Sequence, residues 1–251
     1  MRDLKKYNDR IDVSERIIIE GIKFVLSHFE NQDSLFPRTI STNSNPQIKI
    51  TYEASIQNTL NNIFEVFKKS NYYDCKINGF NYYDQDTENN ESKSKKINIF
   101  IMINLNLQDI SFNKKKLDFI LENTLNKMYL KLDEVHPTVL WNGLGYEIYQ
   151  PLEGSSFENH KYNEFKAYVK DGNISNEFLI FAKKFFTDTK IESNRVITTT
   201  SYNVSVPGTF NFENGEQVEI IHKWDGKKPS ILWINNDFKN HLISMKSKYK
   251  K

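Results

Sequence analysis

Two asparagines two positions apart lie near the end of the most apolar stretch of the sequence. Residues 97–107 read INIFIMINLNL, which predicts a central strand, and the pair is Asn104 and Asn106. Side chains at positions i and i+2 of a strand project from the same face of a sheet. A carboxamide oxygen can ligate a hard cation, but it brings no negative charge. By themselves, the two residues therefore fit a polar pair at the end of a buried strand, with their side chains hydrogen-bonded to neighbouring backbone.

A glycine turn and two histidines are further candidates for chemistry. Gly143 and Gly145 flank Leu144, and a Gly-x-Gly pair mostly serves to permit a tight backbone turn. Glu147 follows on the next predicted strand, where a solvated hairpin residue is the usual role. His136 and His222 have no partner at a metal-ligand spacing, so we expect structural or surface roles for both.

Lysines next to aromatic residues suggest a local nucleic-acid surface. The global charge is only +2, so the chain lacks the bulk attraction of a strongly basic domain. Lys227 and Lys228 lie close to Trp224, and other lysine runs occur at 114–116, at 183–184 and in the C-terminal tail. Such runs are usually solvated faces, but charge beside aromatic rings also suits a groove for single-stranded nucleic acid.

The composition predicts a globular, cytoplasmic protein. Of 251 residues, 38% are hydrophobic and 14% aromatic, enough to fill a core. Cys75 is the only cysteine, which excludes an internal disulfide and thiolate-clustered zinc sites and fits a reducing compartment. Residues 1–10 are charged and no apolar run approaches the roughly 20 residues that span a bilayer, so we expect no membrane association.

Hydrophobic periodicity predicts an α+β fold in which helices and strands alternate along the chain. A helix starting near Asp12, with Glu15 at a capping-box spacing, is followed by a loop after residues 36–38. Further helices are predicted from about residue 55, over 117–132, over 178–186 and over 237–245. Strands are predicted near 75–79 and over 97–107, 138–141, 146–150, 203–206 and 217–222, and a surface loop over 84–96. We expect one domain over residues 1–251, with about 1–70 forming a small N-terminal helical subdomain.

Four segments in chain order resemble archaeal primase-like proteins of the archaeo-eukaryotic primase superfamily. They are residues 36–40 (FPRTI), 100–107, 137–151 (PTVLWNGLGYEIYQP), and 206–211 (VPGTFN) followed by 218–229 (VEIIHKWDGKKP). The third and fourth are the specific ones. The resemblance implies a primase-polymerase-like, RRM-like α+β core, with a mixed or antiparallel sheet flanked by helices.

The resemblance also implies a catalytic site, whose positions carry substitutions here. In relatives, the strand matching residues 100–107 ends with two aspartates that hold Mg²⁺ or Mn²⁺, whereas this chain has Asn104 and Asn106. Glu147 stands where relatives place a phosphate-binding histidine, and the third acidic residue aligns near Glu192. Loss of two carboxylates lowers metal affinity, and a carboxylate repels a triphosphate.

The nucleotide-binding positions implied by the resemblance also carry residues that differ from those of relatives, and these residues are less suited to bind phosphate. Relatives tend to carry an arginine before the Pro-Gly pair and a lysine after it, where this chain has Ser205 and Glu213. The other nucleotide-binding positions are Gly143, Gly145, Tyr146 and Thr209. We therefore expect no cofactor and no metal, or weak metal binding at Asn104, Asn106 and Glu192.

Three hypotheses for function follow. The first is a catalytically inactive primase-like protein that binds single-stranded DNA or RNA through Trp224, Lys227 and Lys228. It would act as an accessory factor in DNA replication or on a mobile element, partnered by an active primase or helicase. The second is an active nucleotidyltransferase that uses Mg²⁺ or Mn²⁺ with substitute carboxylates drawn from Asp109, Glu147, Glu192 and Asp225. The third is a protein-interaction module without nucleic-acid affinity.

Overall fold

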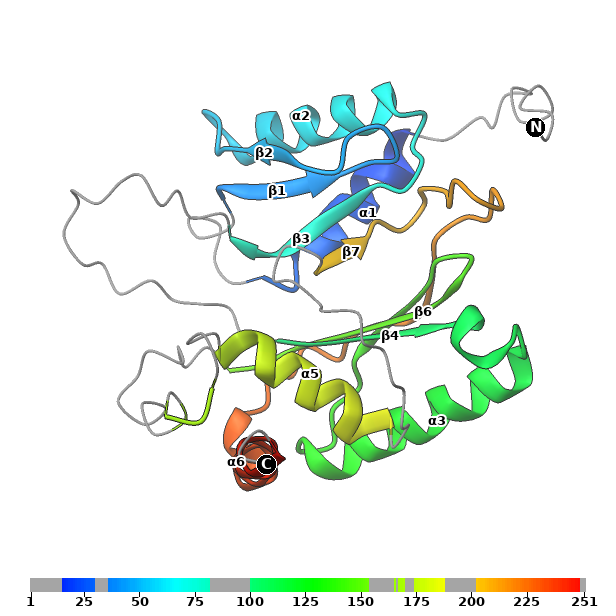
Figure 1. Cartoon of the computed structure of the whole chain (residues 1–251). Helices are drawn as coiled ribbons and strands as arrows, with labels where there is room; N and C mark the ends of the chain where they lie inside the picture. Colours follow the sequence, from blue (N-terminus) through cyan, green and yellow to red (C-terminus); the bar gives the residue numbers. More distant parts are fainter. Residues whose placement is uncertain are drawn as a thin grey trace. The chain divides into compact units, whose positions relative to one another are not determined.

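The chain folds as two compact units, each assembled from separate stretches of sequence (Figure 1). The computed structural model describes residues 15–29, 36–81, 100–153, 165, 167–169, 174–187 and 202–248. Unit 1 contains residues 1–82, 140–143 and 203–220, and unit 2 contains 83–139, 144–202 and 221–251. The expected single domain with a helical subdomain over about 1–70 stays a prediction.

An antiparallel sheet of order β2-β1-β3-β7 forms the centre of unit 1. Its strands are β1 (Arg38–Ser41), β2 (Ile48–Ile50), β3 (Lys76–Asn81) and β7 (Asn203–Ser205). Thr39 pairs with Lys49, and Ile77 pairs with Val204. The prediction of a loop after residues 36–38 is wrong, because β1 and β2 form a hairpin there. Its turn is closed by a hydrogen bond from the Thr42 amide to the Asn45 carbonyl at 2.8 Å.

Two helices of unit 1 pack against each other, α1 (Glu15–Leu26) and α2 (Ile56–Lys69). Their apolar faces are buried as the periodicity predicts, with Ile18 and Ile63 fully buried. Ser55 caps α2 by accepting a hydrogen bond at its Oγ from the Asn58 amide at 3.1 Å. Both predicted helices are therefore confirmed over the described residues, and Asp12 lies outside them.

The second sheet has the order β4-β6-β5-β8. Its strands are β4 (Phe100–Asn106), β5 (Thr138–Trp141), β6 (Gly145–Pro151) and β8 (Glu219–His222). β4 and β6 run antiparallel along their whole length, from the pair Phe100 and Pro151 to the pair Asn106 and Gly145. The prediction that this apolar stretch is a central strand is wrong, because among the described strands β4 lies at the edge of the sheet and pairs with β6 alone. Its apolar residues are nevertheless buried, and Ile101 and Ile103 are fully so.

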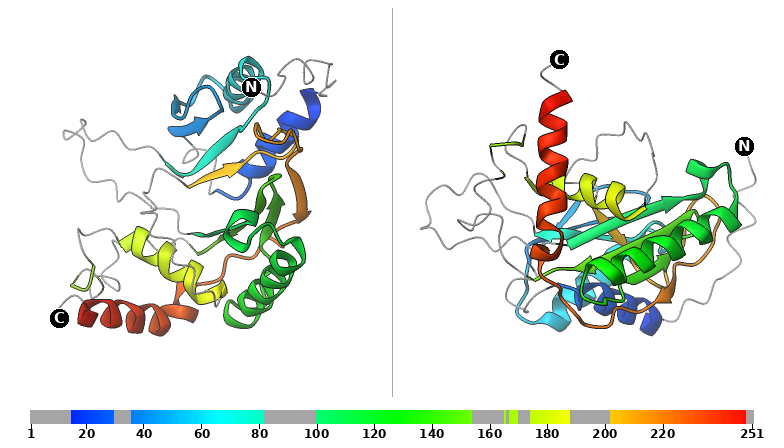
Figure 2. Two further views of the ribbon diagram at one scale, coloured as in Figure 1. Left: turned by 45° about the vertical axis from the view of Figure 1, so that its right-hand side comes forward. Right: turned by 90° about the horizontal axis from the view of Figure 1, so that it is seen from below.

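Helices α3 (Lys114–Lys131) and α5 (Ile174–Thr187) pack on each other and on β4 in unit 2, and Figure 1 shows them on one side of β4 and β6. The short helix η3 (Leu107–Ile110) joins β4 to α3. The chain then ends in η7 (Ile231–Ile234) and α6 (Asn235–Lys248), and α6 lies beside α5 in both views of Figure 2.

The architecture is thus α+β, with antiparallel sheets flanked by helices, in agreement with the predicted class. Within the described ranges, no helix combines the length and apolar character needed to cross a membrane.

Candidate functional site

Three of the four positions that the sequence analysis predicts as a catalytic site lie together on one face of the second sheet. Asn104 of β4 pairs directly with Glu147 of β6, and Asn106 pairs with Gly145. Directly opposite residues of an antiparallel pair share a face, with Cβ atoms about 5 Å apart. Asn106, two positions along β4, faces the same way as Asn104. The structure therefore brings Asn104, Asn106 and Glu147 into one cluster, which we call the Asn-Glu face.

The Asn-Glu face holds one carboxylate and two neutral amides. Glu147 is only 3% exposed, whereas both asparagines are partly exposed. The Asn104 Oδ1 atom is buried and has no hydrogen-bond partner among the described residues. Leaving such a group unsatisfied costs about 1–3 kcal/mol, so it is an unusual feature at the end of a strand. Among the residues that the structure describes, no three His, Cys, Asp or Glu side chains converge to hold a metal ion.

The substitute carboxylates have other positions and partners. Asp225 accepts hydrogen bonds from the backbone amides of His136 and Lys227, both at 2.9 Å, and so stabilises a turn. Asp109 is exposed on η3 and interacts electrostatically with Lys183, whose pKa burial lowers. Glu192 lies outside the described residues, so the hypothesis of replacement ligands stays a prediction.

The glycine turn between β5 and β6 has a steric explanation. A Cβ added to Gly145 would lie 2.0 Å from the Leu105 carbonyl oxygen on β4. Gly143 has a left-handed φ of 85°, and its carbonyl accepts a hydrogen bond from Asn214 Nδ2 at 2.8 Å. Close strand contact and a tight turn therefore account for both glycines without a bound phosphate.

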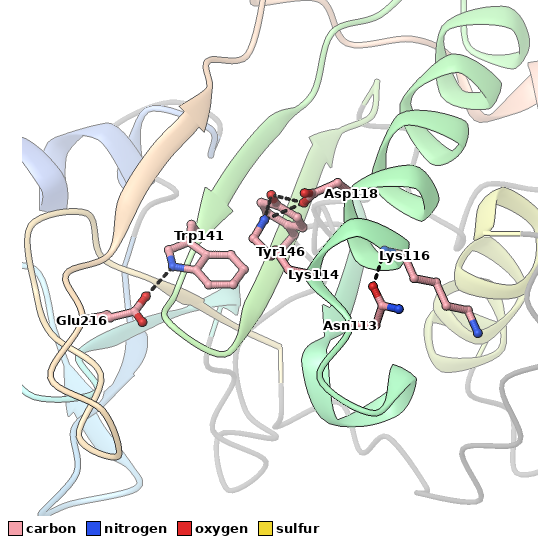
Figure 3. Close-up of polar contacts among 7 residues, drawn as sticks. All are labelled: Asn113, Lys114, Lys116, Asp118, Trp141, Tyr146 and Glu216. Carbon is pink, nitrogen blue, oxygen red and sulfur yellow. Dashed lines mark hydrogen bonds and ion pairs between the residues drawn. The ribbon is translucent and has the colours of Figure 1, made fainter.

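Tyr146 lies on the opposite face from Glu147, as expected for neighbours on a strand. Its hydroxyl donates to Asp118 Oδ1 at 2.8 Å, and Lys114 Nζ donates to the same oxygen at 2.5 Å and to the Tyr146 hydroxyl (Figure 3). The structure thus separates Tyr146 from the Asn-Glu face and uses it to attach α3 to β6.

The pKa values of this network fit a structural role. Burial lowers the pKa of Lys114, but hydrogen bonds to Asp118 and Tyr146 outweigh it, so the pKa ends above its usual value. The hydrogen bond from Lys114 holds the pKa of Asp118 below its usual value. Burial raises the pKa of Tyr146. At neutral pH the network is therefore an ammonium, a carboxylate and a neutral phenol.

The remaining positions that the resemblance assigns to nucleotide binding lie in unit 1. Ser205 and Thr209 are buried and line a small polar hollow, and Thr209 Oγ1 donates to the Val206 carbonyl at 2.6 Å. Glu213 is exposed, and its amide donates to Asn211 Oδ1 at 2.9 Å. In the same unit, Trp141 Nε1 donates to Glu216 Oε2 at 2.7 Å (Figure 3). Sequence reasoning assigned no role to the side chains of Asn211, which ends the segment 206–211, and Glu216, which lies outside the quoted segments.

The predicted nucleic-acid residues lie on the turn that follows β8 in unit 2. Trp224 Nε1 donates to the Lys227 carbonyl at 2.8 Å, and Lys228 Nζ lies 5.9 Å from the centre of the Trp224 ring. Lys227 Nζ instead contacts the carbonyls of Asp133 and Glu134 at 3.4 Å each. Trp224 and Lys228 thus form a cation–π pair, while Lys227 connects the turn to the segment that follows α3.

Comparison with known proteins identifies no relative: no protein-family model, no curated protein and no solved structure matches this chain.

Proposed function

We propose that this chain is a catalytically inactive primase-polymerase-like protein that binds single-stranded nucleic acid. The observation that carries the proposal is the pairing of Asn104 with Glu147 across β4 and β6, with Asn106 on the same face. The primase resemblance assigns two metal-binding aspartates and a phosphate-binding histidine to these positions. Their proximity supports a common inherited site, and their residue types support the loss of its chemistry.

The charge at the Asn-Glu face argues against nucleotidyl transfer. Such transfer needs divalent ions that neutralise the triphosphate, and carboxylates hold those ions. Two amides in place of two aspartates remove two negative charges from the metal position. Glu147 adds a carboxylate where a phosphate needs a donor. An active primase or helicase as partner would then supply the chemistry that this chain lacks.

The wider fold supports the same proposal. The four-stranded sheet β4-β6-β5-β8, with α3 and α5 on one side, supports the proposal in so far as an RRM-like core also has a four-stranded sheet. A surface turn carrying Trp224 and Lys228 offers both charge and a ring to single-stranded DNA or RNA. We place the protein in DNA replication or on a mobile element as an accessory factor.

Restoring the family residues tests the proposal. The triple variant Asn104→Asp, Asn106→Asp, Glu147→His should bind Mn²⁺ at least about tenfold more tightly than the wild type, because two carboxylates return to the metal position. Binding is measured by the loss of the free Mn²⁺ signal in electron paramagnetic resonance. The matched control is Asn123→Asp with Asn126→Asp, which adds the same two aspartates on the exposed surface of α3.

A second assay tests the inactivity of the wild type. Incubation with a single-stranded template, nucleotides and Mn²⁺ should give no template-dependent product. Product that disappears in Glu147→Gln would overturn the proposal and favour the active nucleotidyltransferase. Equal Mn²⁺ binding by the triple variant and the surface control would remove the inherited site as an explanation.

A further inference from the structure

Three exposed rings form a row on the surface of unit 2. The ring centres of Tyr129 and His136 are 5.5 Å apart, and those of His136 and His222 are 5.8 Å apart. The rings come from α3, from the segment before β5 and from the end of β8, and all three residues are exposed. The sequence does not reveal this row, because His136 and His222 are brought together by the pairing of β5 with β8.

The turn after β8 carries Trp224, two residues after His222, and is held at several points. The Trp224 amide donates to Thr138 Oγ1 at 3.2 Å, and the Asp225 amide donates to the His136 carbonyl at 3.1 Å. Gln150 Nε2 donates to the Lys227 carbonyl at 2.9 Å. These bonds fix the turn before any partner arrives, which lowers the entropy lost on binding.

The charge around the rings is nearly balanced. Lysines 131, 223, 227 and 228 lie in these segments, together with Asp133, Glu134, Glu219 and Asp225. The Asp225 carboxylate accepts two backbone amides, and the Lys227 ammonium contacts two backbone carbonyls. A partner held mainly by its phosphates would need more positive charge, whereas a partner that stacks flat rings would not.

We infer that the ring surface (Tyr129, His136, His222 and Trp224) stacks the bases of a single-stranded nucleic acid, with Lys223 and Lys228 contacting its phosphates. The inference rests on the proposed nucleic-acid partner and adds the surface and the mode of recognition. Two phosphate contacts give a weak salt dependence, with log K falling by about 1.4 per tenfold rise in salt. Removal of one stacking ring weakens binding by about 5- to 150-fold.

The test uses the full chain and a fluorescein-labelled 12-mer of thymidylate, with binding followed by fluorescence anisotropy. A 12-mer of abasic sites carries a comparable phosphate charge and no bases. The variants are Tyr129→Ala, His222→Ala and Trp224→Ala, each checked for folding by its melting curve. The matched control is Phe119→Ala, which removes an aromatic ring that is 63% exposed on the same helix as Tyr129.

We expect the three ring variants to lose affinity, the control to keep it, and the abasic oligomer to bind far more weakly. If the thymidylate oligomer binds and the folded ring variants bind equally well, the ring surface is not the site, and the proposed nucleic-acid function stands. Equal binding of the abasic oligomer would likewise overturn stacking. If no oligomer binds, both the ring surface and the nucleic-acid function fail.

Discussion

Gly145 tests how closely β4 and β6 must approach at the Asn-Glu face. In Gly145→Ala, the new Cβ would lie 2.0 Å from the Leu105 carbonyl oxygen and 2.9 Å from the Asn106 Cα, where real Cβ contacts stay above 3.0 Å. Backbone atoms cannot rotate away as a side chain can, so the two strands must separate. Forced overpacking of this kind costs about 1–3 kcal/mol.

Strand separation would also weaken a nearby hydrogen bond. The Leu107 amide donates to the Leu144 carbonyl at 2.9 Å, one position from Gly145, and its loss adds about 1 kcal/mol. The total of about 3 kcal/mol corresponds to a fall in Tm of about 6–12 °C for a chain of this length. Scanning calorimetry measures this change.

The control for Gly145→Ala is Gly226→Ala. Gly226 has a left-handed φ of 84° and nothing within 4 Å of an added Cβ, so alanine there costs only the backbone strain of about 1–2 kcal/mol. If Gly145→Ala melts at or above the temperature of Gly226→Ala, the steric reasoning is refuted.

Two further predictions concern the titratable groups. Burial raises the pKa of Cys75 to about 12, so its alkylation by iodoacetamide at pH 8 should be at least about 1000-fold slower than that of a free thiol. Mass spectrometry measures this rate, and equally fast labelling of folded and guanidine-unfolded protein would contradict it. The pKa of Asp118 is lowered by its hydrogen bond from Lys114, so the stability it adds is present at pH 7 and is lost as the pH falls through that lowered pKa. Because its side chain is 44% exposed, solvent screening limits the cost of Asp118→Asn to about 0.5 kcal/mol at pH 7. Urea unfolding at pH 7 and pH 3 tests this prediction, which a larger loss at pH 3 would contradict.

The helices could be predicted because local signals agree with their packing. Ser55 and the spacing of Leu60, Ile63 and Phe67 mark both the start and the buried face of α2. The hairpin of β1 and β2 could not be predicted, because its strands are short and its turn is rich in Ser and Asn, a composition typical of loops. What stabilises that hairpin is pairing with β3, which is distant in sequence.

The Asn-Glu face could be predicted only in part. Alternation along a strand puts Asn104 and Asn106 on one face, and it also separates Tyr146 from Glu147. The register that joins Asn104 to Glu147 depends on which residues of β4 and β6 pair. No turn joins these two strands directly, so the local sequence does not specify that register. The ring surface was not predicted, because strand order brings together His136 and His222, which are far apart in the sequence.

The discontinuous composition of unit 1 has a consequence for synthesis of the chain. β1, β2 and β3 leave the ribosome well before β7, which must pair with β3 to complete the sheet. Until residues 203–205 have been translated, β3 keeps an unpaired edge that can pair with other nascent chains. Slow translation between these two strands would therefore lengthen the period during which the nascent chain can aggregate.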